Sequence, residues 1–214
     1  MLFDLYCVAG AAPHRGDRRV IVAAGAEGIA ISSPDGSSWT PFIIPTSDDV
    51  YAAAAGGVMG NGAISIFGLA GNAGAYLFSC ATNTSDWHAQ ASNTGNTLRG
   101  LLQWPGQFVA VGDHGTIRCG RIFLRRNSPV LANYNAVTWG NGTYVAAGSR
   151  GTLASSLDGN TWSSNVVGTQ NFLSVSYGAN RFVAVGEGLS VAVSQDGLNW
   201  TNEFLATPPD FNGL

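Results

Sequence analysis

Few residues of this 214-residue chain have the types and spacing that catalysis requires. Asp113 and His114 are adjacent and lie beside a glycine, but a catalytic triad also needs a serine at a nucleophile elbow, and no serine stands in that context. Cys7, Cys80 and Cys119 are odd in number and set among apolar residues, which favours reduced core thiols, and the three histidines are equally scattered. A metal site needs clustered ligands. We therefore expect no catalytic residue, no metal and no cofactor.

The balance of charge points away from nucleic acid and from membranes. Only 11% of residues are charged, the formal net charge is −3, and all ten basic residues are arginine. General binding to nucleic acid has little electrostatic support in such a chain, and no apolar run approaches the roughly 18 residues needed to span a membrane. The first ten residues carry Asp4 and no basic residue, so we expect no signal peptide and a protein made in the cytoplasm.

Four of the ten arginines form one cluster, the arginine patch, which consists of Arg118, Arg121, Arg125 and Arg126. Such a run is usually a solvated outer strand, and arginines on an edge strand also prevent unwanted pairing. Because a charge-poor chain concentrates its positive charge here, the patch also predicts contact with an acidic or polar protein partner.

A short polar motif, SxDGxxW, occurs three times and indicates which elements position these residues. Its copies are Ser33/Asp35/Gly36/Trp39, Ser156/Asp158/Gly159/Trp162 and Ser194/Asp196/Gly197/Trp200. The aspartate can accept hydrogen bonds from backbone N–H groups of a hairpin turn, glycine supplies a positive φ, and serine adds a local bond. The tryptophan is expected to pack back over the edge of the sheet that contains the turn. We predict that the three copies stabilise turns and are not catalytic.

The spacing of the motif reveals a repeat. The last two aspartates are 38 residues apart and the first two are 123 apart, which is three intervals of 41. A period of about 40 residues is typical of propeller blades and solenoids. Two further repeats with altered turns are therefore expected, and together they divide the chain at approximately 1–45, 46–92, 93–130, 131–167 and 168–214.

Each repeat contains short runs rich in Val, Ile, Phe and Tyr and bounded by Gly, Asn, Asp or Pro, which predicts strands. Runs such as QFVAVG at 107–112 and RFVAVG at 181–186 are apolar on both faces, as expected for a small sheet packed between neighbouring sheets. The sequence thus predicts one all-β domain over 1–214, a β-propeller of five blades with four antiparallel strands each. Whether the C-terminal FNGL at 211–214, which resembles FLSV at 172–175, begins a further repeat or crosses the junction between blades five and one is left open.

The SxDGxxW turn resembles the Asp-box, or BNR-like, repeat of bacterial and viral propellers, and the resemblance covers most of the chain. The usual Asp-box has a residue between Asp and Gly, whereas the two are adjacent here, which places the chain with the looser relatives of the family. A sialidase-like member would need three arginines in the family's context and a Tyr paired with a Glu. Arg99, Arg150 and Arg181 lack that context, and no Tyr is evidently paired with Glu27, Glu187 or Glu203.

The turns that follow the second strand of each repeat suggest a binding face. They read GAEG, GDHG, GSRG and GEGL, so glycine is kept while the residues between vary. In a propeller these turns open on the face where ligands usually bind. The predicted turn face consists of Glu27, Asp113, His114, Arg150 and Glu187, and its alternative is a set of solubilising turn residues.

These observations favour a non-enzymatic structural or interaction propeller with protein partners in a larger assembly. Within this class we favour a component of a phage or virus particle, although a cytoplasmic assembly factor would share its features. The alternatives are a carbohydrate-binding propeller with a glycan partner and, less favoured, a sialidase-like glycosidase.

Overall fold

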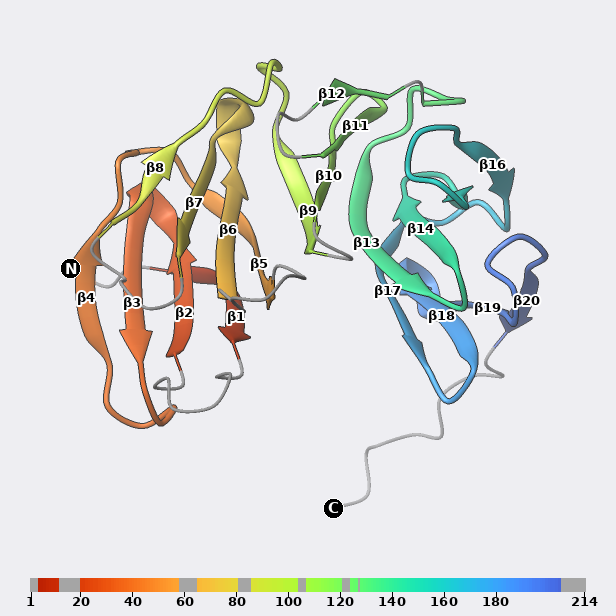
Figure 1. Cartoon of the computed structure of the whole chain (residues 1–214). Helices are drawn as coiled ribbons and strands as arrows, with labels where there is room; N and C mark the ends of the chain where they lie inside the picture. The colour runs from red at the N-terminus through yellow and green to blue at the C-terminus, as the bar shows by residue number, and fades with distance from the viewer. Residues whose placement is uncertain are drawn as a thin grey trace.

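The computed structural model describes residues 4–11, 20–57, 65–80, 86–103, 107–120, 124–126 and 128–204, with the backbone alone at Gly57, Ser65, Cys80 and Phe204. Within these ranges, twenty strands form five antiparallel sheets of four strands, with three short 3₁₀ turns. The sheets stand side by side as blades (Figure 1). The predicted five-bladed, all-β propeller is confirmed.

Each sheet is formed by four consecutive strands in chain order. Blade 1 comprises β1 (Leu5–Ala11), β2 (Val20–Gly25), β3 (Ile29–Ser33) and β4 (Thr40–Ile43). Blade 2 comprises β5 (Val50–Gly57), β6 (Ser65–Gly71), β7 (Tyr76–Cys80) and β8 (His88–Ala89). Blade 3 comprises β9 (Leu98–Gln103), β10 (Phe108–Gly112), β11 (Thr116–Cys119) and β12 (Leu124–Arg125).

The last two blades follow the same order and complete the five sheets. Blade 4 comprises β13 (Tyr134–Gly140), β14 (Thr143–Gly148), β15 (Thr152–Ser156) and β16 (Ser163–Val166). Blade 5 comprises β17 (Phe172–Gly178), β18 (Arg181–Gly186), β19 (Ser190–Ser194) and β20 (Thr201–Phe204). The 3₁₀ turns η1 (Ala26–Gly28), η2 (Asn72–Gly74) and η3 (Glu187–Leu189) each join a second strand to a third. Every blade falls within one of the predicted repeats.

The first strand of each blade packs on the first two strands of the blade before it. Contacts of this kind join β5 to β1 and β2, β9 to β5 and β6, β13 to β9 and β10, and β17 to β13 and β14. The first strands therefore line the inside of the propeller, and the fourth strands lie outside.

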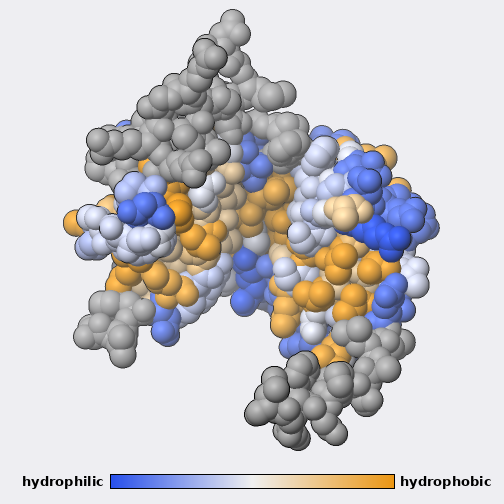
Figure 2. All heavy atoms as spheres, turned by 90° about the horizontal axis from the view of Figure 1, so that it is seen from below, coloured by the Kyte–Doolittle hydropathy of each residue, from blue (hydrophilic) through white to orange (hydrophobic). Residues whose placement is uncertain are grey.

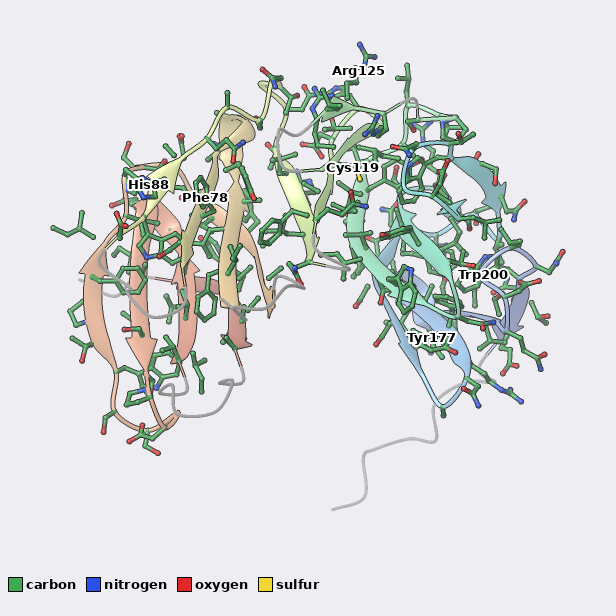
Figure 3. All side chains as sticks on the ribbon, in the orientation of Figure 1. Phe78, His88, Cys119, Arg125, Tyr177 and Trp200 are labelled. Atoms are coloured by element: carbon green, nitrogen blue, oxygen red, sulfur yellow. The ribbon has the colours of Figure 1, made fainter. Side chains whose placement is uncertain are left out.

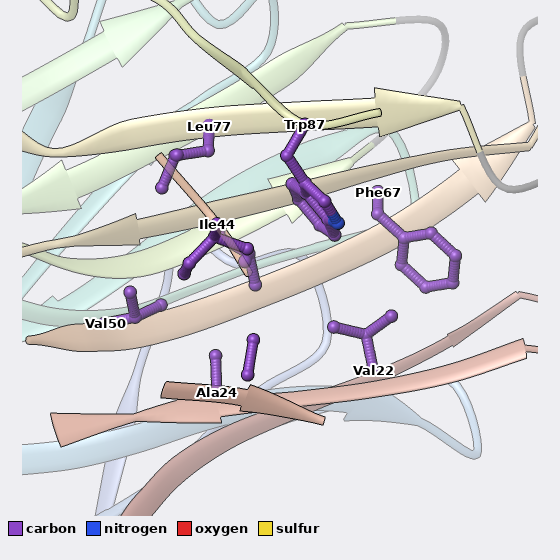
Figure 4. Packing of buried hydrophobic residues seen from close by; sticks show 9 residues of the cluster. Val22, Ala24, Ile44, Val50, Phe67, Leu77 and Trp87 are labelled. Carbon is purple, nitrogen blue, oxygen red and sulfur yellow. The ribbon is translucent and has the colours of Figure 1, made fainter. Parts of the chain in front are cut away.

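The hydrophobic core is divided into four clusters, one between each pair of successive blades. Between blades 1 and 2, Val22 and Ala24 of β2 share one cluster with Phe67, Leu77 and Trp87 (Figure 4). Alternate residues of each second strand face opposite neighbours, which explains why runs such as FVAVG are apolar throughout. Cys119 is buried in the third cluster and Cys7 is half-buried, and both are free thiols.

The five blades form an open arc, because no comparable contact joins blade 5 to blade 1 within the described residues. Val145 and Ala147 of β14 are fully buried against blade 5, whereas their counterparts on β18, Val183 and Val185, are 37% and 43% exposed. Figure 2 shows two lobes separated by an open notch, with apolar side chains on their surfaces. Each terminal blade thus presents an apolar sheet face that internal blades bury.

On blade 1 the free face is hollowed. A cavity of about 630 Å³ is lined mainly by apolar side chains, among them Tyr6, Val8, Ile31 and Trp39. Val8 and Trp39 are both exposed there.

Candidate functional site

The SxDGxxW turn of blade 4 has the hydrogen bonds that its residue types predict. Asp158 Oδ1 accepts bonds from the backbone N–H of Asn160 at 2.7 Å and of Thr161 at 2.8 Å, and from Ser156 Oγ at 3.0 Å. Trp162 Nε1 donates to the carbonyl oxygen of Gly159, whose φ is 73°. The tryptophan thus folds back over its own turn.

The turns of blades 1 and 5 repeat these bonds. Asp35 and Asp196 accept the same backbone and serine donors as Asp158. Trp39 Nε1 donates to the carbonyl oxygen of Gly36 at 3.2 Å, and Trp200 Nε1 donates to that of Gly197 at 3.1 Å. Gly36 and Gly197 have φ of 79° and 75°, the left-handed values expected of the motif glycine. Backbone N–H donors lower the pKa of the aspartate in all three turns.

The turns also contact the preceding blade, which the sequence did not indicate. Ser155 Oγ of blade 4 donates to the carbonyl oxygen of Gly197 in the blade 5 turn. Asn165 Nδ2, on β16 of the same blade, donates to the carbonyl oxygen of Leu198 at 2.6 Å. A motif turn therefore joins two blades as well as two strands.

The three copies differ in burial, although the motif predicted equivalent turns. Gly36 is exposed and Trp39 is 39% exposed, because blade 1 has no preceding blade to cover its turn. Gly159 is buried and Trp162 is 6% exposed, since blade 3 lies against them. Trp200 is half-buried at the edge of the core cluster between blades 4 and 5. That all three turns serve stability alone stays a prediction.

Blade 2 keeps the tryptophan of the motif without its turn. Trp87 is buried in the first core cluster and stacks on Phe42 of blade 1 with ring centroids 5.8 Å apart. Its Nε1 has no hydrogen-bond partner within the described residues. The packing role of the tryptophan is therefore retained where its hydrogen bond to a turn glycine is absent.

The turn face lies at the turns between second and third strands, where the backbone is left-handed. Glu27, His114 and Arg150 have φ of 53°, 54° and 55°. Their side chains are exposed. Asp113 and Glu187 precede the left-handed position in their own turns.

Two of the five turn-face residues are engaged within the molecule. Asp113 forms a bidentate ion pair with Arg99, with Nε–Oδ1 at 2.7 Å and Nη2–Oδ2 at 3.1 Å. This contact raises the pKa of Arg99. Glu187 Oε2 accepts a hydrogen bond from Asn171 Nδ2 at 2.9 Å. Among the described residues, the side chains of Glu27, His114 and Arg150 form no hydrogen bond or ion pair, and the structure does not bring the five side chains together.

A set of inter-blade acceptors was not predicted from the sequence, and its members are Asp49, Asn133 and Asn171. Each stands just before the first strand of its blade and accepts a backbone N–H from the left-handed residue of the preceding blade. The bonds are Glu27 N to Asp49 Oδ1, His114 N to Asn133 Oδ1 and Arg150 N to Asn171 Oδ1, each 2.9 Å long. The available signal was an Asp or Asn before the first strand of four of the five repeats, with Thr97 as the exception.

The arginine patch lies on the outer strands of blade 3. Arg118 is on β11 directly opposite Arg125 on β12, and Arg126 follows that strand. Figure 3 shows Arg125 at the upper edge of the molecule, above Cys119. Arg121 lies outside the described residues, so its predicted place in the patch stays a prediction.

Arg118, Arg125 and Arg126 line one cavity of about 220 Å³, the arginine cavity, together with His114 of the turn face. Arg118 is 6% exposed and donates from Nε to the carbonyl oxygen of Ser92 at 3.0 Å and from Nη2 to that of Asn93 at 2.8 Å. The Nε atom of Arg126 is buried and has no hydrogen-bond partner among the described residues. One predicted turn-face residue and three predicted patch residues thus meet at one place.

The arginine cavity is electropositive without an internal counterion. Within the described part of the chain, none of its three arginines forms an ion pair, since the ion pairs there are Arg99–Asp113 and His88–Asp86. Burial, and after it the charge of Arg125, lowers the pKa of Arg118, while burial raises the pKa of the neighbouring Cys119 thiol. Guanidinium groups in this arrangement can bind a carboxylate through charge-assisted hydrogen bonds.

The described residues contain neither a cluster of metal ligands nor a membrane-spanning helix. No group of three His, Cys, Asp or Glu side chains lies close enough together to hold a metal ion. No helix there is long and apolar enough to cross a membrane.

Comparison with known proteins supports the fold. No family model and no curated protein matches the sequence. Among solved structures, the computationally designed Ika8 protein matches with a TM-score of 0.63 and 14% identity over 92% of this chain. YCF48, a β-propeller solved bound to the D1 peptide, matches with a TM-score of 0.53 and 15% identity over 94% of this chain.

Both solved proteins are longer than the part that this chain matches. The match covers 61% of the Ika8 chain, so this chain spans about three fifths of its length, and it covers 80% of YCF48. At these identities the likeness extends to the propeller fold alone. Membership of the Asp-box family stays a prediction.

Proposed function

We propose that this protein is a non-enzymatic interaction propeller that binds an acidic segment of a protein partner in the arginine cavity of blade 3. The observation that carries this proposal is the convergence of Arg118, Arg125 and Arg126 on one cavity without a carboxylate partner among the described residues. Like charges directly opposite each other on neighbouring strands destabilise a sheet. A bound carboxylate would offset this repulsion between Arg118 and Arg125.

The state of the hydrogen-bond donors supports a carboxylate ligand. Two donors of Arg118 are held by the carbonyl oxygens of Ser92 and Asn93, which fixes the guanidinium at the cavity wall. Arg126 Nε is a buried donor without an acceptor in the described structure. A buried polar group without a partner costs free energy, and an acidic side chain in the cavity would supply the acceptor.

The shape of the site suits a side chain of a larger partner better than an independent small molecule. A volume of about 220 Å³ is below the range of roughly 300–1,000 Å³ that is typical of small-molecule sites. The cavity also opens at an outer blade edge, where a partner can approach. The fold is known to hold a peptide in another protein, since YCF48 was solved bound to the D1 peptide.

A non-catalytic role agrees with the engagement of the acidic turn residues. Asp113 is held by Arg99, and Glu187 accepts a hydrogen bond from Asn171, which supports a structural role for these two side chains. Membership of a phage or virus particle and binding of a glycan stay predictions, because no contact in the described residues favours either.

The test measures binding of a fluorescent hexaglutamate peptide by anisotropy at low and at high salt. We expect saturable binding that weakens with salt, and about tenfold weaker binding for the double variant Arg125→Ser/Arg126→Ser. The matched control is Arg150→Ser, which removes an exposed arginine outside the cavity and should leave the affinity unchanged.

Three outcomes would overturn the proposal. They are an absence of saturable binding, equal affinity of wild type and double variant, and equally tight binding of a single-stranded DNA oligonucleotide of the same charge, which would indicate unspecific attraction of polyanions. Circular dichroism of the double variant shows whether the fold is retained.

A further inference from the structure

Blade 5 has an open face that no described strand covers. At each of the four internal junctions, the first strand of the following blade covers the first two strands of the preceding one. On blade 5 those strands are β17 and β18, and Val183 and Val185 of β18 are exposed. This face has the shape and composition of a site for one more first strand.

The sequence pattern of the first strands occurs once more after blade 5. Each first strand begins with Asp, Asn or Thr, followed by a large apolar residue, a variable residue, a small residue and another apolar residue. The five copies are DLYCV at 4–8, DVYAA at 49–53, TLRGL at 97–101, NYNAV at 133–137 and NFLSV at 171–175. The C-terminal residues 210–214 read DFNGL and fit all five positions.

The length of chain after blade 5 also fits. At the four internal junctions, the first residue of this pattern lies five to eight residues beyond the last residue of the preceding fourth strand. Asp210 lies six residues beyond the end of β20 at Phe204. A segment at this distance can return from the outer strand to the inside of the propeller, as the chain does at the other junctions.

Blade 5 has a residue equivalent to the backbone donors that bind the next first strand at other junctions. Glu27, His114 and Arg150 each donate a backbone N–H to the Asp or Asn that begins the next first strand. The equivalent residue of blade 5 is Gly188, which lies in η3 and has a φ of 61°. The next copy of the pattern along the chain begins with Asp210.

We propose that residues 210–214 dock on the open face of blade 5 as the first strand of a sixth repeat. Asp210 then accepts the Gly188 N–H, and Phe211 and Leu214 cover Val183 and Val185. The apolar pair corresponds to Phe172 and Val175, which pack on blade 4 in the fourth core cluster. Hydrophobic burial of two large side chains and one hydrogen bond hold the segment in place.

Two other occupants of this face must be distinguished in the test. Blade 1, either of the same chain or of a second copy, also begins with an aspartate, and the Asp4 carboxylate accepts no hydrogen bond within the described residues. If blade 1 were the occupant, Asp4 would bind Gly188. Asp4 and Asp210 are therefore alternative acceptors for one donor.

The experiment measures amide hydrogen exchange of Gly188 by NMR in the full chain and in two variants. We expect a protected Gly188 amide whose exchange becomes about tenfold faster in Asp210→Ala and is unchanged in Asp4→Ala. Phe211→Ser should shift the methyl signals of Val183 and Val185. The control Asn212→Ala alters the variable position of the pattern and should leave both signals unchanged.

Three results would overturn the proposal. Faster exchange in Asp4→Ala but not in Asp210→Ala would assign the face to blade 1, and protection that rises with protein concentration would assign it to a second copy. An unprotected Gly188 amide in the wild-type chain would show that the segment does not dock.

Discussion

At the scale of single residues, the aspartates of the SxDGxxW turns show how a repeated side chain acts locally. Each carboxylate accepts two backbone N–H groups and one serine hydroxyl, and the following glycine adopts the positive φ that the turn needs. Because these donors favour the charged form, the pKa of each aspartate lies below its usual value. The turn is thus stabilised by ionisation of its own aspartate.

This arrangement predicts a dependence of stability on pH. A group whose pKa is lowered by folding contributes stability above its ordinary value of 3.8, and that contribution is lost as the pH falls through the folded-state pKa. The Tm of the wild type should therefore fall steeply below about pH 4. Asp196→Asn should flatten this fall, because the asparagine does not titrate.

The control for this measurement is Glu203→Gln, which removes the same charge from an exposed position on β20 of the same blade. Differential scanning calorimetry from pH 7 to pH 2 gives Tm for all three proteins. Equal acid sensitivity of wild type and Asp196→Asn would mean that the turn aspartate does not contribute to stability through its charge.

At the scale of elements, the blades are joined by apolar packing and by the inter-blade acceptors Asp49, Asn133 and Asn171. Each acceptor satisfies the backbone N–H of a left-handed residue in the preceding blade. The bond fixes the start of each first strand against the neighbouring turn. It therefore sets the position of the strand that carries most of the inter-blade contact.

A pair of substitutions at Asn133 tests the importance of the acceptor. Asn133→Ala removes the acceptor for the His114 N–H and should lower the free energy of unfolding by about 1 kcal/mol. Asn133→Asp keeps an oxygen acceptor, as Asp49 does in blade 2, and should be nearly neutral. Urea denaturation measures both, and equal stability of the alanine and aspartate variants would rule out a contribution from this bond.

Sequence predicted the elements well because their signals are local. The SxDGxxW motif marks the hairpin before a fourth strand, and runs such as RFVAVG mark strands that are apolar on both faces. The inter-blade acceptors were missed because the position changes identity, with Asp49, Thr97 and Asn133 in successive blades. Their common role depends on a partner more than 15 residues away, which no local pattern reveals.

For the same reason, the motif could not predict how deeply each turn is buried. Gly36 and Gly159 occupy the same motif position, yet Gly36 is exposed and Gly159 is buried. Trp39, Trp162 and Trp200 likewise range from exposed to buried. The difference depends on which blade covers the turn, and a local motif does not show which residues lie near it in the fold.

The candidate site was predicted in part. Clustering in the sequence identified Arg118, Arg125 and Arg126, but the burial of Arg118 and its bonds to Ser92 and Asn93 depend on the linker between blades 2 and 3. The turn-face residue His114 was assigned to a different surface, yet it lines the same cavity. Both facts follow from packing between repeats, which a periodic sequence does not specify.

At the scale of the whole molecule, the five blades form an arc with two different ends. Blade 5 presents Val183 and Val185, and blade 1 presents the hollow lined by Val8 and Trp39. Sequence could not predict this openness, since RFVAVG in blade 5 is as apolar as its buried counterpart QFVAVG in blade 3. The arginine cavity lies in blade 3, at the middle of the arc and away from both ends.

Binding of an acidic segment in the arginine cavity can be tested by locating the ligand on the molecule. The measurement is the chemical-shift change of arginine Nε–H signals in ¹⁵N-labelled protein when hexaglutamate is added. We predict that the signals of Arg118, Arg125 and Arg126 shift together and saturate with one affinity, while those of Arg150 and Arg181 stay in place. Shifts confined to Arg150 or Arg181, with the signals of the cavity arginines unchanged, would show that the peptide binds elsewhere.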